Sequence, residues 1–183
     1  MTDPTATERA GRFAGTPRGP TQLAAVIGRP VTHSLSPIIH NAAFAEAGLD
    51  WTFLAFEVGP DAVGAALDGV RALGLRGLSV TMPYKEAVAD LVDRRTADAD
   101  RLAAVNCVVN DDGQLIGHNT DGPGFLDAIA ASAGFVAEGR RAVVVGAGGA
   151  ARAIVLALSQ AGAADVAVLN RTASRAEAAA ALA

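Results

Sequence analysis

The stretch Arg141-Ala-Val-Val-Val-Gly-Ala-Gly-Gly-Ala-Ala-Arg152 decides the predicted fold. Its first five residues form a short apolar run typical of a buried strand, and a glycine-rich turn and a helical pattern over 150–161 follow. The glycine spacing G-x-G-x-x-A in this context is typical of turns that bind the pyrophosphate of a dinucleotide. Glycines let the backbone approach the phosphates, and the helix N-terminus offers N–H groups. The alternative is a turn that only packs a helix closely against a sheet.

The end of the next predicted strand, 165–169, indicates which dinucleotide is bound. An NAD site would carry an acid there for the ribose hydroxyls, but this strand is followed by Asn170, Arg171 and Thr172. Arg171 and Arg175 can face a 2′-phosphate, and Thr172 can donate a hydrogen bond. NADP is therefore the predicted cofactor, and two solvated arginines are the alternative. The candidate cofactor-binding residues are Gly146, Ala147, Gly148, Gly149, Ala150, Asn170, Arg171, Thr172 and Arg175.

Outward from this stretch, short apolar runs alternate with helical patterns. Strands are expected at 23–28, 51–58 and 77–82, a hairpin with an Asp-Gly turn at 105–117, and helices at 36–47, 61–73, 83–92, 94–103, 124–133 and from 174. The alternation predicts an α/β fold with mostly parallel sheets. We expect a disordered leader at 1–21, an α/β substrate domain at 22–134 and a partial Rossmann dinucleotide-binding domain at 135–183. Only two strands of the second domain precede the end, so an N-terminal portion of a longer protein is expected.

Composition excludes several classes of protein. The chain has 183 residues, of which 51% are hydrophobic and 19% charged, so it can bury a substantial core. Its single cysteine, Cys107, supports neither a disulfide framework nor a metal site. A net charge of −4 argues against nucleic acid as a partner. The longest stretch without charge, 30–45, is too polar to span a membrane, and the N-terminus lacks the apolar region of a signal peptide. A cytoplasmic protein is expected.

Polar clusters follow the strands of the first domain. Ser36-Pro37 predicts a helix that begins with Ser36 as its N-cap, whereas Ser34 has no obvious structural role. The hydroxyl groups of both serines are expected beside this helix N-terminus, which is a site suited to a carboxylate. Thr81 shares a strand face with Ser79. Lys85, the single Lys beside 14 Arg, is expected in the first turn of a helix, where the dipole disfavours added positive charge and favours proton release.

Asn106 and Asp121 flank the hairpin. Asn106 lies early in the predicted first strand, and the run Asn119-Thr120-Asp121-Gly122 ends the second. Asp121 is either a helix N-cap, the commoner role of Asp before Gly-Pro-Gly, or a residue that takes part in catalysis.

Six motifs, taken in order, resemble the shikimate dehydrogenase family. They are His33-Ser-Leu-Ser-Pro37, Ser79-Val-Thr-Met-Pro-Tyr-Lys85, Ala104-Val-Asn106, Asn119-Thr-Asp-Gly122, Gly146-Ala-Gly-Gly-Ala150 and Asn170-Arg-Thr172. The resemblance covers about residues 26–180. It departs at Ser79, where many members have Asn, which could change substrate preference.

The resemblance implies a chemistry and a set of ligands. The family reduces 3-dehydroshikimate to shikimate with NADPH, in the biosynthesis of chorismate and aromatic amino acids. By motif, Ser34 and Ser36 would hold the substrate carboxylate. Thr81, Lys85, Asn106 and Asp121 would hold the ring oxygens, and Lys85 and Asp121 would be the catalytic pair that handles the proton.

The resemblance leaves open the activity of this chain by itself and the choice among several related functions. It implies substrate and cofactor contacts beyond residue 183, so poor cofactor binding and weak or absent turnover are expected if these residues are the whole product. Alternatives are a quinate/shikimate dehydrogenase using NAD or NADP, and a non-catalytic sensor of shikimate-like acids. A homodimer is possible, and no metal is expected.

Overall fold

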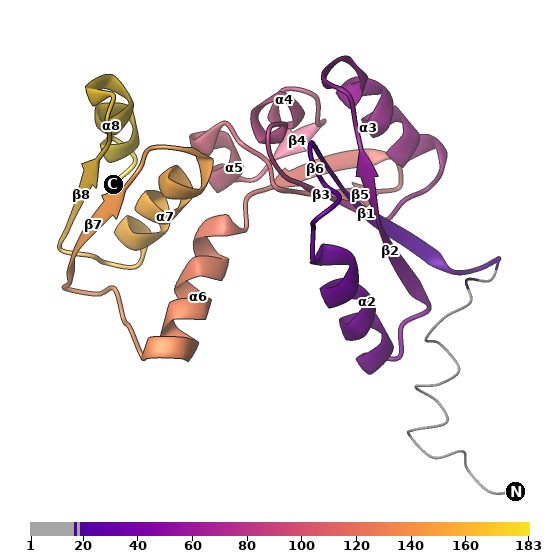
Figure 1. Cartoon of the computed structure of the whole chain (residues 1–183), viewed down its shortest axis with the longest axis horizontal. Coiled ribbons are helices and arrows are strands. Elements are labelled where there is room, and N and C mark those ends of the chain that lie inside the picture. The colour runs from indigo at the N-terminus through magenta and orange to yellow at the C-terminus, as the bar shows by residue number, and fades with distance from the viewer. Residues whose placement is uncertain (1–16, 18) are drawn as a thin grey trace, which may run out of the picture. The chain divides into compact units, whose positions relative to one another are not determined.

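The structure is a computed structural model that describes residue 17 and residues 19–183. Contacts divide the chain into two compact units. The first contains the described residues up to Arg94 together with Cys107–Gly117, and the second contains Arg95–Asn106 and His118–Ala183. The units are coloured by residue number in Figure 1.

The first unit is built on a six-stranded sheet of order β2-β1-β3-β5-β6-β4. The strands are β1 (Gln22–Gly28), β2 (Trp51–Glu57), β3 (Gly77–Val80), β4 (Arg94–Arg95), β5 (Cys107–Asp111) and β6 (Gln114–His118). β1 pairs in parallel with β2 and β3, whereas β5 runs antiparallel to β3. The helices are α2 (Ser36–Glu46), α3 (Val63–Ala72), which follows the 3-10 turn η1 (Pro60–Ala62), and α4 (Lys85–Ala89).

Alternation along β1 gives the sheet two apolar faces, which α2 and α3 cover from opposite sides (Figure 1). Ala24, Val26 and Phe53 form a cluster with Val31 on the α2 face, and Phe44 of α2 packs against it. Asn41 of α2 hydrogen-bonds both the N–H and the carbonyl of Phe53, at 2.8 and 3.0 Å. These bonds satisfy backbone groups on the outer side of β2, which is the edge strand of the sheet.

Glycines end α2 and α3 where the sequence predicts them. Gly48 and Gly74 have φ of +66° and +64°, a left-handed conformation that costs glycine little. After α2, the Gly48 N–H donates to Ala45 and the Leu49 N–H donates to Phe44, which is the Schellman pattern. The helices therefore end by local chemistry and turn the chain back into the sheet.

A carboxylate joins α3 to the hairpin of β5 and β6. Asp93 accepts the Leu115 N–H at 2.7 Å and both of its oxygens lie 3.0 Å from one nitrogen of Arg71. Arg71 also donates to the Gly113 carbonyl at 3.2 Å. The Leu115 N–H and the Arg71 guanidinium together hold the pKa of Asp93 below its usual value.

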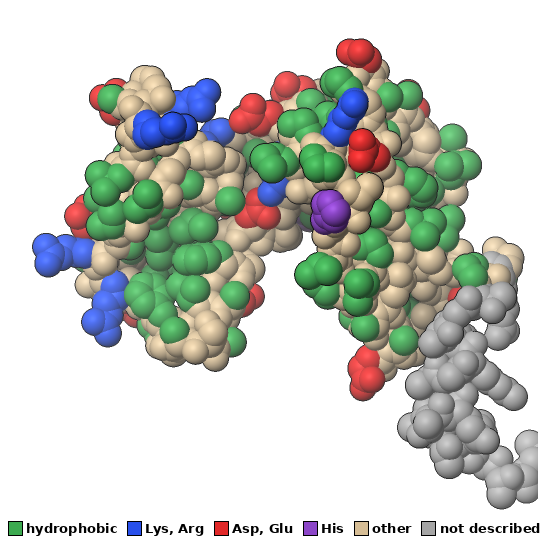
Figure 2. Space-filling view, in the orientation of Figure 1, with side chains coloured by type: hydrophobic (Ala, Val, Ile, Leu, Met, Phe, Trp, Pro, Cys, Tyr) green, Lys and Arg blue, Asp and Glu red, His purple; other side chains and the backbone are tan. Residues whose placement is uncertain are grey.

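The second unit contains a two-stranded parallel sheet of β7 (Arg141–Val145) and β8 (Asp165–Leu169). Its helices are α5 (Ala97–Leu102), α6 (Asp121–Ala133), α7 (Gly149–Gln160) and α8 (Ala173–Ala180). α7 supplies most of the core, because its residues from Val155 to Leu158 are all buried. In contrast, Val143, Val145 and Leu169 on the sheet are exposed. Hydrophobic side chains also lie on the face of this unit that carries α6 and α7 (Figure 2).

The helices α6 and α7 are in close contact at Gly122. A Cβ atom added at Gly122 would lie 2.6 Å from the Ala153 carbonyl oxygen and 2.8 Å from the Ala157 Cβ. No side chain fits at these distances without movement of the α7 backbone. Gly122 therefore sets the separation between the helix that begins at Asp121 and the helix that follows the glycine-rich turn.

The predicted α/β fold is confirmed, and three local predictions are wrong. The helix predicted over 83–92 is only Lys85–Ala89, because a turn closed by Tyr84 N–H to Thr81 precedes it and Asp93 pairs with Leu115 after it. The helix predicted over 94–103 begins at Ala97, since Arg94 and Arg95 form β4. The helix predicted over 124–133 begins three residues earlier, at Asp121.

The predicted domains and the compact units divide the chain differently. Because α6 packs on α7, contacts group α6 with the second unit, although the sequence assigned it to the domain at 22–134. The domain boundary at 134 stays a prediction. The predicted leader, 1–21, lies mostly outside the described residues; within it, the Thr21 hydroxyl donates to Asp50 at 2.8 Å.

Asp93→Asn should make the stability of the first unit less sensitive to acid. The depressed pKa means that the carboxylate adds stability that is fully present above its ordinary pKa of 3.8 and is lost as pH falls through the folded-state value. The variant should be less stable at neutral pH and lose less on acidification, as measured by urea unfolding over a pH series. Asp68→Asn is the control, because Asp68 is 81% exposed and 3.4 Å from Arg71. Equal acid sensitivity of Asp93→Asn and wild type would contradict the assignment.

Gly122→Ala should destabilise the second unit by about 1–3 kcal/mol, because the added methyl group overlaps the α7 backbone. Gly124→Ala is the matched control in the same helix, since a Cβ there meets nothing within 4 Å. It should leave stability unchanged or raise it by up to ~1 kcal/mol. Urea unfolding midpoints measure both. Similar midpoints for the two variants would show that α6 and α7 are not closely packed.

Candidate functional site

Ser34 and Ser36 lie at the start of α2 in the first unit. The Ser34 hydroxyl oxygen accepts the Ser36 N–H at 3.2 Å. The helix includes Ser36 as its first residue, and the flanking residue Leu35 makes no side-chain cap. The predicted N-cap role of Ser36 is therefore wrong, and Ser34 has the local structural role that the sequence did not indicate. Both side chains are half-buried.

Thr81 and Lys85 follow β3 in the same unit. The Thr81 N–H donates to Ile27 at 2.9 Å, which extends the pairing of β3 with β1. A Cβ atom at Gly28 would overlap the Thr81 methyl group, so a glycine is required beside Thr81. Lys85 is the first residue of α4 and is half-buried. Its neighbour Tyr84 is buried and donates its hydroxyl to the Val58 carbonyl, which fixes the start of this helix.

Asn106 and Asp121 are brought into direct contact within the second unit. The Asn106 amide nitrogen donates to Asp121 Oδ1 at 2.7 Å and to the Thr120 hydroxyl at 3.0 Å. The Asn106 amide oxygen accepts the Thr120 N–H at 2.8 Å. Asp121 is the first residue of α6, where the helix dipole stabilises a carboxylate. The alternative role of Asp121 as a helix N-cap is not observed, because Thr120 precedes the helix instead.

Asn119 lies beneath this contact and is 6% exposed. Its amide nitrogen donates to the Ala104 carbonyl at 3.0 Å, and its amide oxygen accepts the Asp121 N–H at 3.2 Å. Sequence reasoning did not assign a role to Asn119 or Thr120. Their position between the end of the predicted strand and Asp121 could have indicated a role. Their bonding partners at 104–106, however, depend on how the two strands of the hairpin pair, which the sequence does not reveal.

The glycine-rich turn joins β7 to α7. Gly146 has φ of +113°, a conformation that favours glycine, and its N–H donates to Leu169 at 2.7 Å. Cβ atoms at Gly148 and Gly149 would meet nothing within 4 Å, so the space over the turn is open. α7 begins at Gly149 and runs for 12 residues, which places its N-terminus at the turn. The geometry fits a pyrophosphate on the turn.

The residues predicted to bind the 2′-phosphate follow β8 and lead into α8. The Asn170 amide donates to the Thr172 carbonyl at 3.0 Å, which closes the loop that carries Arg171. Arg171, Thr172 and Arg175 are exposed. β7 and β8 are parallel, so this loop and the glycine-rich turn lie at the same end of the sheet.

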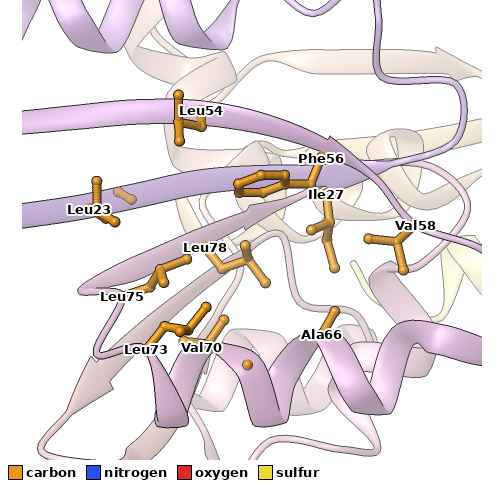
Figure 3. Close-up of a pocket in the computed structure, with 12 residues that line it drawn as sticks. Leu23, Ile27, Leu54, Phe56, Val58, Ala66, Val70, Leu73, Leu75 and Leu78 are labelled. Atoms are coloured by element: carbon orange, nitrogen blue, oxygen red, sulfur yellow. The ribbon is translucent and has the colours of Figure 1, made fainter.

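A cavity of about 290 Å³ in the first unit is separate from these polar groups. It lies between the sheet and α3, with Leu54 and Phe56 of β2 across from Val70 of α3 and from Leu73, which follows that helix (Figure 3). Its lining side chains are all apolar. A carboxylate or a polyhydroxylated ring would find no side-chain hydrogen-bond donor there, so the cavity is not the candidate substrate site.

The structure groups the predicted substrate-binding residues in three places. Ser34 and Ser36 share the start of α2, Thr81 and Lys85 share the segment after β3, and Asn106 contacts Asp121. Lys85 belongs to the first unit and Asp121 to the second, so their pairing stays a prediction.

Burial raises the pKa of the Cys107 thiol beside Asn106. Among the described residues, no three His, Cys, Asp or Glu side chains are grouped to hold a metal, and no helix has the length and apolarity to cross a membrane.

Comparison with known proteins matches both halves of the chain. The family model "Shikimate dehydrogenase substrate binding domain" matches residues 26–108, and "Shikimate / quinate 5-dehydrogenase" matches 129–182. A shikimate dehydrogenase (NADP(+)) of Moorella thermoacetica is 51% identical over 156 residues, which cover 85% of this chain and 52% of that protein.

Solved structures agree with these matches. Shikimate 5-dehydrogenase of Thermus thermophilus in complex with NADP(H) and shikimate has a TM-score of 0.82 and 42% identity, over 88% of this chain and 60% of that one. Shikimate 5-dehydrogenase of Listeria monocytogenes in complex with shikimate and NAD has a TM-score of 0.87 and 40% identity, over 93% and 60%.

The fold and the glycine-rich turn define an α/β protein of the dinucleotide-binding class. Within that class, the chain belongs to the shikimate dehydrogenase family. It spans about half the length of the curated relatives that it matches.

Proposed function

We propose that this chain is part of an enzyme that reversibly reduces 3-dehydroshikimate to shikimate with NADPH. The observation that supports this most is the 2.7 Å hydrogen bond between Asn106 and Asp121. It joins two polar side chains, 15 positions apart, that the family motifs assign to the same substrate ring. The names of the matched relatives agree with the proposal.

Side chains from four of the sequence motifs would hold the substrate. Ser34 and Ser36 would bind its carboxylate, because their hydroxyl groups lie at the N-terminus of the 11-residue helix α2, where a negative charge is stabilised. Thr81, Lys85, Asn106 and Asp121 would bind the ring oxygens. An Asn amide both donates and accepts, which suits it to hydroxyl groups.

Lys85 and Asp121 are proposed to handle the proton. NADPH, when bound, supplies the hydride that adds to the carbonyl carbon. An ammonium group stabilises the negative charge that develops on the carbonyl oxygen, and the Lys–Asp pair delivers the proton that converts this oxygen to a hydroxyl. In the reverse direction, the same pair removes the hydroxyl proton.

The described residues fit NADP at the second unit. The open space over Gly148 and Gly149 leaves room for the pyrophosphate, and Ala147 and Ala150 add no bulky side chain to the turn. Arg171 and Arg175 would bind the 2′-phosphate, with Asn170 and Thr172 shaping the loop. A cytoplasmic location and a homodimer stay predictions.

Two alternatives remain as outcomes of the experiments. A quinate/shikimate dehydrogenase would use the same residues with a second ring substrate, and the Listeria structure with NAD keeps NAD as a candidate cofactor. A non-catalytic sensor would bind shikimate without hydride transfer.

The assay that tests the function follows NADPH formation from shikimate and NADP⁺. It uses this chain and, in parallel, this chain joined to the part of the Moorella relative that follows the matched region. We expect turnover in the joined protein and weak or absent turnover in the chain alone. Shikimate binding without turnover in both proteins would support the sensor, and faster oxidation of quinate than of shikimate would support the second dehydrogenase.

Lys85→Ala in the joined protein should lower kcat by orders of magnitude with a smaller effect on KM, because it removes a group needed at the reacting oxygen. Lys85→Arg separates proton transfer from charge, since Arg keeps its proton near neutral pH. Near-normal kcat in Lys85→Ala would remove Lys85 from the chemistry. Retained activity in Lys85→Arg would reduce its role to charge anchoring.

Arg171→Ala should weaken NADP⁺ binding about 10- to 100-fold and leave NAD⁺ binding nearly unchanged, because only NADP⁺ carries the 2′-phosphate. Arg140→Ala is the control, since Arg140 is exposed and precedes β7, at the opposite end of the strand from the glycine-rich turn. Isothermal titration of both variants with both dinucleotides measures the effect. Tighter binding of NAD⁺ than NADP⁺ by the wild type would contradict the cofactor assignment.

A further inference from the structure

Two short segments of the second unit run side by side around the Asn106–Asp121 contact. The Asn106 N–H donates to the His118 carbonyl at 3.0 Å, and the Thr120 N–H donates to the Asn106 side chain at 2.8 Å. These bonds align residues 104–106 with residues 118–121. Residue 106 immediately precedes β5 and residue 121 begins α6, so the alignment determines where the amide meets the carboxylate.

Asn119 adds one connection between these segments and one bond within the second of them. Its amide nitrogen donates to Ala104 and its amide oxygen accepts the Asp121 N–H, at 3.0 and 3.2 Å. One half of the amide therefore holds the segment that leads to Asn106, and the other half holds the backbone of Asp121. No other residue type of this size offers a donor and an acceptor in this arrangement.

We infer that Asn119 is a positioning residue, which holds the Asp121 carboxylate against the Asn106 amide without contacting substrate itself. Its side chain is 6% exposed, and both of its polar ends are used by the backbone. The inference rests on the proposed function for its kinetic consequence, but its geometric consequence can be measured in this chain alone.

The first unit contains a matched control. Asn110 is 7% exposed, and its amide nitrogen donates to the carbonyls of Val70 and Leu75 at 3.2 and 2.8 Å. Its amide oxygen accepts the Gly113 N–H at 2.8 Å. Asn110 and Asn119 are thus two buried amides, each used at both ends by the backbone, and only Asn119 adjoins Asp121. If Asn119 had a purely structural role, substitutions at Asn119 and at Asn110 would have equivalent effects.

The experiment compares Asn119→Leu with Asn110→Leu. Each substitution removes a buried amide of similar size and leaves backbone groups unpaired, so both should lower the stability of the protein. The first measurement is hydrogen exchange of the Asn106 side-chain amide, followed by NMR in this chain. Asn119→Leu should speed this exchange at least about tenfold relative to wild type, which corresponds to about 1.4 kcal/mol of lost local protection. Asn110→Leu should leave it unchanged.

The second measurement is steady-state kinetics in the joined protein. Asn119→Leu should lower kcat about tenfold or more with KM changed less than about threefold, because the carboxylate is misplaced at the reacting oxygen. Asn110→Leu should leave both constants near those of the wild type. If Asn119→Leu does not fold, Asn119→Ser and Asn110→Ser replace the pair, since a Ser side chain cannot reach both backbone groups.

Equal effects of the paired variants on Asn106 exchange would overturn the inference, whatever the enzyme's activity. Faster exchange with unchanged kcat would confine Asn119 to local structure and also overturn it. A wild-type joined protein without turnover would instead contradict the proposed function. In that case the exchange measurement alone decides whether Asn119 positions Asp121.

Discussion

The close approach of α6 to α7 at Gly122 is the constraint on which the second unit depends. The missing side chain lets the first turn of α6 lie directly against the backbone of Ala153. Asp121 begins α6, and the glycine-rich turn leads into α7. One contact therefore links the carboxylate of the candidate site to the turn that fits a dinucleotide. A helix pair separated by an ordinary side chain would loosen both at once.

The polar groups of the candidate site lie at the ends of strands and helices. Ser34 accepts an N–H at the start of α2, Thr81 extends the pairing of β3, and Asp121 begins α6. Strand and helix ends leave backbone donors and acceptors that must be paired, so short polar side chains collect there. The same residues are then available to a polar ligand. The apolar cavity beside α3 has no such groups and belongs to the packing of the first unit.

The sequence predicted the features that arise from local patterns. The glycine spacing after an apolar run placed β7, the turn and α7, and Gly48 and Gly74 ended their helices as expected. The errors arise where a distant segment competes. Asp93, between the helices predicted over 83–92 and 94–103, binds the distant Leu115, and Asn119 acquires its role only when the strand register brings Ala104 beside it. A single sequence does not show which residues of the two segments pair with each other.

Ligand mapping by NMR would show whether the glycine-rich turn and the polar strand ends of this chain are the cofactor and substrate sites. NADP⁺ and shikimate are titrated separately into the labelled chain, and the backbone amide shifts are followed. NADP⁺ is expected to perturb residues 146–150 and 170–175, and shikimate is expected to perturb residues near Ser34, Thr81 and Asn106. Shifts from either ligand that are confined to the apolar cavity beside α3, with the turn and the polar groups unchanged, would contradict this assignment.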